Sequence, residues 1–184
     1  MLTPHLRAFV LLSIATLAWA QPSAERRELM KLPADAQSVV NTWLHQDCGI
    51  DEVQRLHDRL QQLGLALEPV FWEAYRLGPT EAERNTLLEQ SRQRYQERQS
   101  HLRQFGERLF GKEEATRLHA TSEEQYVQRR LEDYVNRYQS AALAGLGVVG
   151  TSTSELKPIA QDDKNPAQGA AKEALQSIER RQKR

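Results

Sequence analysis

Apolar side chains recur along much of this chain at intervals of three and four residues, the period of an α-helix with one buried face. The first such segment starts at Pro33 and ends at Cys48-Gly49, and the second starts at Asp51, a typical N-cap residue, and ends at Gly64. Their apolar positions are Val39, Val40, Trp43 and Leu44 in the first segment, and Val53, Leu56, Leu60 and Leu63 in the second. No stretch shows the sustained alternation typical of a β-strand. The pattern predicts an all-α fold.

A third helix is expected from about Pro69, which suits the first turn of a helix, to Gly78-Pro79. Its apolar residues cover more than half of the helix circumference, which indicates burial on more than one side. We predict that this helix forms the centre of the fold. Glu68 and Glu73 flank it, and capping or solvation explains these two residues as well as a catalytic carboxylate pair does.

Two long helices are expected next, and each begins with a capping box. Thr80 and Glu83 mark the start of the fourth helix, which runs to about Phe110, and Ser122 and Gln125 mark the start of the fifth. The fifth helix is expected to end near Leu143, ahead of the glycines 145, 147 and 150. A short connector makes such helices antiparallel neighbours. We therefore predict a domain over residues 33–149 in which three short helices pack on a long antiparallel hairpin.

The remaining segment, residues 150–184, looks unlike a packed element. It is rich in Ser, Thr, Asp, Gln and Pro up to Gly169, and it ends in a basic run that includes Arg180 and Arg181. The small apolar residues between Gly169 and this basic run have helical spacing but offer little area to bury. We predict a flexible tail that contains a marginal basic helix.

The N-terminus has the three parts of a secretory signal peptide. Arg7 precedes an apolar run, residues 8–17, and Ala18-Trp19-Ala20 places small residues at the cleavage site. Because the run is shorter than the roughly 20 residues that span a bilayer, we expect cleavage after Ala20 rather than a membrane anchor. Residues 21–32 would then be a polar lead. The predicted location is the periplasm, or outside the cell, with no stable membrane insertion of the processed protein.

The net charge and the cysteine content limit which partners and which covalent links the protein can have. The chain has 25 Lys and Arg against 25 Asp and Glu, so no net charge attracts it to nucleic acid, and we expect no nucleic-acid partner. Cys48 is the single cysteine, which excludes an internal disulfide but leaves a buried thiol or a link to another chain open. The sequence does not determine the oligomeric state.

Three residues are the nearest approach to a metal site: His45, Cys48 and His57. Zinc prefers such ligands, but structural zinc sites show paired short spacings, and only one His-x-x-Cys occurs here. We therefore predict no metal, no cofactor and no catalytic residue. The alternative is a small hydrolase or metal-dependent enzyme that uses Cys48 and His57 beside the aromatic third helix.

The leading hypothesis is an exported helical binding or scaffolding protein without catalytic activity of its own. Its partner would be another envelope protein, because the signal peptide removes the chain from the cytoplasm. The exposed part of the fourth helix combines arginines with an aromatic residue, and the basic end of the chain is a second candidate surface. The candidate partner-binding residues are Arg94, Tyr95, Arg98, Arg180 and Arg181.

Overall fold

A computed structural model of the protein describes residues 26–45 and 50–183. Within these ranges all regular secondary structure is helical, which confirms the predicted all-α class. The expected signal peptide, residues 1–20, and Cys48 lie outside the described residues. The elements are α1 (Arg27–Met30), α2 (Ala34–His45), α3 (Ile50–Leu63), the 3₁₀ helix η1 (Gly64–Leu67), α4 (Glu68–Leu77), α5 (Glu81–Phe110), α6 (Lys112–His119), α7 (Glu123–Val149), α8 (Leu156–Gln161) and α9 (Gln168–Gln182).

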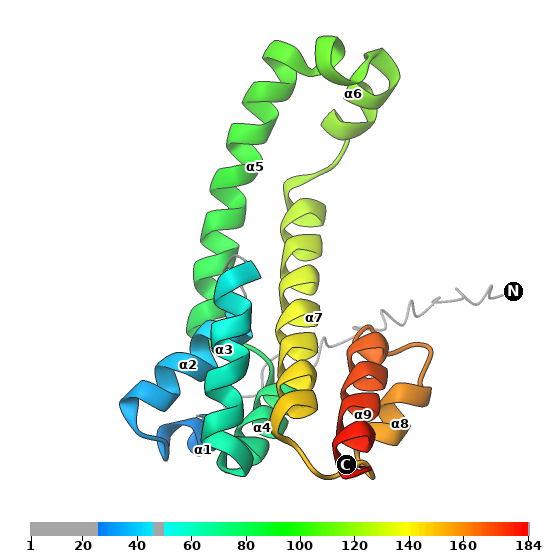
Figure 1. The fold of residues 1–184 in the computed structure, drawn as a ribbon. Coiled ribbons are helices and arrows are strands. Elements are labelled where there is room, and N and C mark those ends of the chain that lie inside the picture. The colour runs from blue at the N-terminus through cyan, green and yellow to red at the C-terminus, as the bar shows by residue number, and fades with distance from the viewer. Residues whose placement is uncertain (1–25, 46–49, 184) are drawn as a thin grey trace, which may run out of the picture.

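Helix α7 is the axis of the molecule (Figure 1). Helix α5 runs away from the N-terminal helices, α6 folds over at its far end, and α7 returns beside α5 in the opposite direction. Helices α2, α3 and α4 pack on α7, while the main contacts of α5 are with α6 and α7. Of the two hairpin helices, α7 is therefore the one that the short helices mainly contact. We call residues 94–126 the arm and the other described residues the base.

Helix α4 lies at the centre of the base, as its apolar circumference predicts. Its side chains Val70, Phe71, Trp72 and Ala74 are buried, and they pack against α7. A buried hydrogen bond ties a second helix to the same place, since Trp43 Nε1 donates to the carbonyl of Ala141 at 2.8 Å. On α3 the predicted buried face is confirmed for Leu56 and Leu60, whereas Val53 is 39% exposed.

Gly145 and Gly147 lie inside α7 at sites of close packing, so the prediction that the helix ends ahead of them is wrong, whereas Gly150 does end the helix. Helix α7 continues to Val149. A Cβ atom added at Gly145 would lie 2.6 Å from the ring of Phe71, and one at Gly147 would lie 2.9 Å from the Cα atom of Ala174. The missing side chains let α4 approach one side of α7 and α9 approach another.

The prediction of a flexible tail over residues 150–184 is also wrong for its described part. Helices α8 and α9 pack on each other, and α9 packs along α7. Leu156, Ala171, Ala174 and Ile178 are each at most 2% exposed and belong to the same core as α4. The folded unit therefore extends well past the predicted boundary at 149. Small side chains make this packing possible because they allow the helix axes to come close.

The described part of the predicted polar lead, from Arg26 onward, also folds onto the base. Leu29 in α1 is buried in the core. The carboxylate of Glu73 accepts hydrogen bonds from the backbone N–H groups of Arg27, at 3.0 Å, and Glu28, at 2.9 Å. Glu68 does the same for the chain after α7, where it accepts from the N–H of Thr151 at 3.0 Å. Both acids on α4 thus hold flanking backbone in place.

Candidate functional site

Local sequence determines where the two long helices begin. Both predicted capping boxes are confirmed: Thr80 and Glu83 bond reciprocally at the start of α5, and Ser122 and Gln125 do so at the start of α7. A capping box satisfies N–H groups that the first helical turn leaves without partners. The helices that follow are 30 and 27 residues long, so the hairpin reaches beyond the base.

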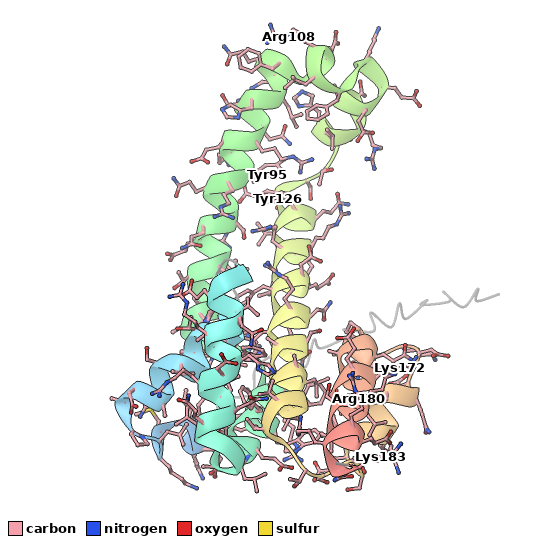
Figure 2. The ribbon with its side chains drawn as sticks, in the orientation of Figure 1. Tyr95, Arg108, Tyr126, Lys172, Arg180 and Lys183 are labelled. Carbon is pink, nitrogen blue, oxygen red and sulfur yellow. The ribbon has the colours of Figure 1, made fainter. Side chains whose placement is uncertain are left out.

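The seam between the two helices of the arm is aromatic and polar, unlike the apolar core of the base. Figure 2 shows Tyr95 of α5 beside Tyr126 of α7, and their ring centroids are 5.7 Å apart. The hydroxyl of Tyr95 donates to the carbonyl of Thr121 at 3.0 Å. The guanidinium of Arg98 lies over the Tyr126 ring at 5.3 Å from its centroid. Two of the candidate partner-binding residues, Tyr95 and Arg98, therefore also brace the arm.

At the far end of the arm, α6 folds back against α5 through small residues. Gly106 and Ala115 are both buried, and a Cβ atom at Gly106 would touch that of Ala115 at 3.4 Å. Gly111 joins the two helices with a φ of +79°, a conformation that other residues rarely adopt. The close contact sets α5 and α6 side by side.

A groove of about 610 Å³ follows from this arrangement. We call it the tip groove, and it is lined by Arg94, Glu97, Arg98, His101, Leu102, Leu109, Phe110, Glu114 and Leu118. Leu109 is 64% exposed and Phe110 is 52% exposed. Large apolar side chains gathered at one exposed place are a recognised feature of interaction sites. The groove includes two of the candidate residues from the sequence, Arg94 and Arg98.

The charges around the tip groove are unevenly compensated. Glu114 accepts hydrogen bonds from Arg117 at 2.6 and 2.7 Å, which lower the pKa of Glu114. Among the described residues, the one hydrogen-bond donor to Glu97 is the neutral side chain of Gln93, at 3.2 Å. Within residues 26–45 and 50–183, Arg94 forms neither a hydrogen bond nor an ion pair. The wall contributed by α5 therefore offers arginine side chains that form no ion pair with a carboxylate of the described residues.

A second polar cluster lies where the hairpin meets the base, around the carboxylate of Glu83. His45 Nε2 lies 3.1 Å from Glu83 Oε1, and the guanidinium of Arg26 pairs with Glu83 Oε2. His45 Nδ1 donates to the carbonyl of Asn41 at 2.7 Å. Since both ring nitrogens face hydrogen-bond acceptors, the doubly protonated imidazolium fits this site best. Arg26 also lies over the ring of Tyr138, at 5.1 Å from its centroid.

The acid–base properties of this cluster follow from its contacts. The hydrogen bond to Glu83 raises the pKa of His45 against the opposing effect of burial. Burial by itself would raise the pKa of Glu83, but the bonds from His45 and Thr80 and the charge of Arg26 lower it to about 2. Desolvation raises the pKa of the buried Tyr138 hydroxyl. These groups join α2, α5 and α7, and they pair His45 with the carboxylate of Glu83.

The basic end of the chain divides into an engaged arginine and exposed ones. Arg181 donates to the carbonyls of Gly147 and Gly150, the latter at 2.7 Å, and so caps the C-terminus of α7. A cation there is favoured by the helix dipole. The hydrogen bonds of Arg180 to other described residues stay within α9, and Arg180 is exposed like Lys172 and Lys183 (Figure 2). Sequence reasoning missed the capping role because it treated residues 150–184 as unpacked.

The alternative site around Cys48 and His57 gains no support from the described residues. His57 Nδ1 lies 3.7 Å from Asp58 Oδ1 at the partly exposed side of α3. Across residues 26–45 and 50–183, no three His, Cys, Asp or Glu side chains gather as a metal site would require. Cys48 lies outside these ranges, so its role in that hypothesis stays a prediction. In the same ranges, none of the helices has both the length and the apolarity of a membrane span.

Comparison with known proteins adds neither a family nor a function. No protein-family model, curated protein sequence or solved structure matches this chain. The tip groove and the Glu83 cluster are therefore interpreted from their own contacts. The groove could be found only in part from the sequence, since Arg94 and Arg98 stand out but the return of α6 over α5 does not.

Proposed function

We propose that the protein is an exported helical binding or scaffolding protein that contacts another envelope protein through the tip groove. The observation that carries the proposal is the exposure of Leu109 and Phe110, at 64% and 52%, at the end of a projecting arm. Exposed apolar surface of this kind is energetically unfavourable in water and is covered when a partner binds.

The arrangement of base and arm supports this division of roles. The short helices and the C-terminal pair bury a continuous core around α7, to which the tip groove contributes nothing. In the proposal they act as the foundation from which the long hairpin presents its far end. In this proposal Leu109 and Phe110 contact the partner and contribute little to folding.

The proposed location rests on the sequence features of residues 1–20. Fractionation of cells that express the full chain, followed by mass measurement of the protein, tests it. We expect the protein in the periplasmic or extracellular fraction with Gln21 as its first residue. A cytoplasmic protein that keeps Met1 would overturn the export part of the proposal.

Site-specific photo-crosslinking tests the contact surface directly. A photoreactive phenylalanine analogue replaces Phe110 in one variant and Glu52, an exposed residue of the base, in a matched control. We expect a discrete crosslinked partner from position 110 in intact cells and none from position 52. The proposal is wrong if position 110 yields no adduct, or if both positions yield the same adducts.

A further inference from the structure

The tip groove also indicates which chemistry a partner must have, an inference that rests on the proposed function. We propose that the groove binds an amphipathic helix whose apolar stripe is flanked by acidic side chains. Three features carry this inference: the cations along one wall, the apolar floor, and the length over which both extend.

The cationic wall comes from α5. Arg94, Arg98 and His101 lie on successive turns of the helix, at spacings of four and three residues, so they project from the same side. Arg98 contacts the Tyr126 ring, and no ion pair within residues 26–45 and 50–183 involves any of the three. Glu97, on the same wall, offsets one of the two arginine charges, and Arg117 compensates Glu114 on α6. The charge of the other arginine is left over, which favours a partner with carboxylates.

The floor of the groove favours apolar side chains between those carboxylates. Leu102 is buried, whereas Leu109 and Phe110 are largely exposed, so the floor is deep at one end and open at the other. The rings and branched chains of an incoming helix can pack there at intervals of three and four residues. Recognition of an amphipathic helix in an apolar groove uses this spacing.

The length of the groove favours a helix over a small amphiphile. From Arg94 to Phe110 the α-helical rise amounts to about 24 Å, which corresponds to roughly four turns of a docked helix. Like charges on two copies of the arm would face each other in a symmetric pair, which disfavours a second copy of this chain as the occupant.

Two designed peptides test the inference. Each is a helix of sixteen residues with the same leucine stripe, flanked by glutamates in one peptide and by lysines in the other. Fluorescence anisotropy measures the binding of each peptide to the protein that begins at Gln21 and keeps all later residues. We expect the glutamate peptide to bind about tenfold more tightly, the effect of two or three exposed ion pairs, and its affinity to fall as salt rises.

Variants of the protein locate the binding site. Arg94→Glu with Arg98→Glu should weaken the glutamate peptide about tenfold and strengthen the lysine peptide. Leu109→Ser with Phe110→Ser should weaken both peptides. Arg55→Glu with Arg129→Glu makes the same change of charge at exposed positions outside the groove and should leave both affinities unchanged. Circular dichroism checks that each variant retains its helical content.

The outcomes separate this inference from the proposed function. Equal affinity for the two peptides, or an equal response to both pairs of arginine variants, overturns the acidic helix as occupant. A partner crosslinked at position 110 would then still support the contact surface. If neither peptide binds while the protein dimerises through Phe110 or binds anionic vesicles, the occupant is a second copy or a membrane and the inference is wrong. If position 110 yields no adduct either, both proposals fail.

Discussion

The base and the arm are both built from helices, yet they bury different kinds of side chain. In the base, Phe71 is fully buried against a glycine of α7, and the residues around it are almost all apolar. In the arm, a tyrosine pair and side-chain hydrogen bonds hold α5 to α7, and Phe110 faces solvent. Stability in such a molecule resides where apolar area is buried.

This contrast assigns different tasks to the two regions. Close helix packing leaves no room in the base for a side chain at Gly145 or Gly147. The seam of the arm is polar, and the side chains of Leu109 and Phe110 are largely exposed to solvent. A region that contributes little to folding is free to present a surface for recognition. Three sets of variants test this division.

The largest effect is expected from removing a phenylalanine in each region. Phe71→Ala removes a side chain that is 0% exposed and should lower the free energy of unfolding by about 3–5 kcal/mol. Phe110→Ala, the same chemical change at a 52% exposed position, should lower it by less than about 0.5 kcal/mol. Urea denaturation followed by circular dichroism measures both. Similar losses for the two variants would refute the division.

An intermediate effect is expected at the contact between α7 and α9. Gly147→Ala places a Cβ atom 2.9 Å from the backbone of Ala174 and should destabilise the protein by about 1–3 kcal/mol. Gly169→Ala is the matched control, because nothing lies within 4 Å of a Cβ atom there. Because alanine has a higher helix propensity than glycine, Gly169→Ala should leave the thermal midpoint unchanged or raise it slightly. An unchanged midpoint for Gly147→Ala would indicate that α9 does not pack on α7.

The smallest effect is expected from the Glu83 cluster at the junction of the two regions. The pKa of Glu83 is lowered from 4.5 to about 2, so its contribution to stability is present above pH 4.5 and is lost as pH falls toward 2. The pKa of His45 is raised from 6.5, so its contribution is present below pH 6.5 and is lost as pH rises through the raised value. The pair therefore stabilises the fold most between about pH 4.5 and 6.5.

His45→Asn tests this pH dependence. Relative to the unmodified protein it should cost about 1 kcal/mol at pH 5.5, and the difference should shrink as pH rises past the raised pKa of His45. His101→Asn removes an exposed histidine without an ion pair in the described part of the chain and serves as the control. A His45→Asn difference that stays constant from pH 5.5 to 9 would show that the ion pair with Glu83 contributes nothing.

Local patterns were enough to predict the helices but not all of their contacts. The all-α class, the central position of α4 and both capping boxes follow from short-range spacing, and the structure confirms them. Gly145 and Gly147 were misread as breakers because their role depends on Phe71 and Ala174, which are distant in sequence. The helix in the C-terminal segment was expected, but its packing was missed for the same reason: small residues such as Ala171 bury little area alone and pack well against a helix that has glycines.

The candidate site was predictable to a similar extent. Arg94 and Arg98 are visible as a basic stretch, and the structure places both beside the tip groove. The groove itself depends on the return of α6 over Gly106, which no periodicity in α5 indicates. Arg181 differs from Arg94 and Arg98. The sequence places it in a basic run that we expected to be solvent-exposed, but its guanidinium donates to the carbonyls of Gly147 and Gly150.

Hydrogen exchange of the native protein tests the central claim, that α7 and α9 form the stable core and the arm lies outside it. We predict that amides of residues 141–149 and 171–178 exchange only through global unfolding. Amides of residues 103–119 should exchange roughly a hundredfold faster or more, through local opening. Rapid exchange in α9, or protection of the arm equal to that of α7, would contradict the claim.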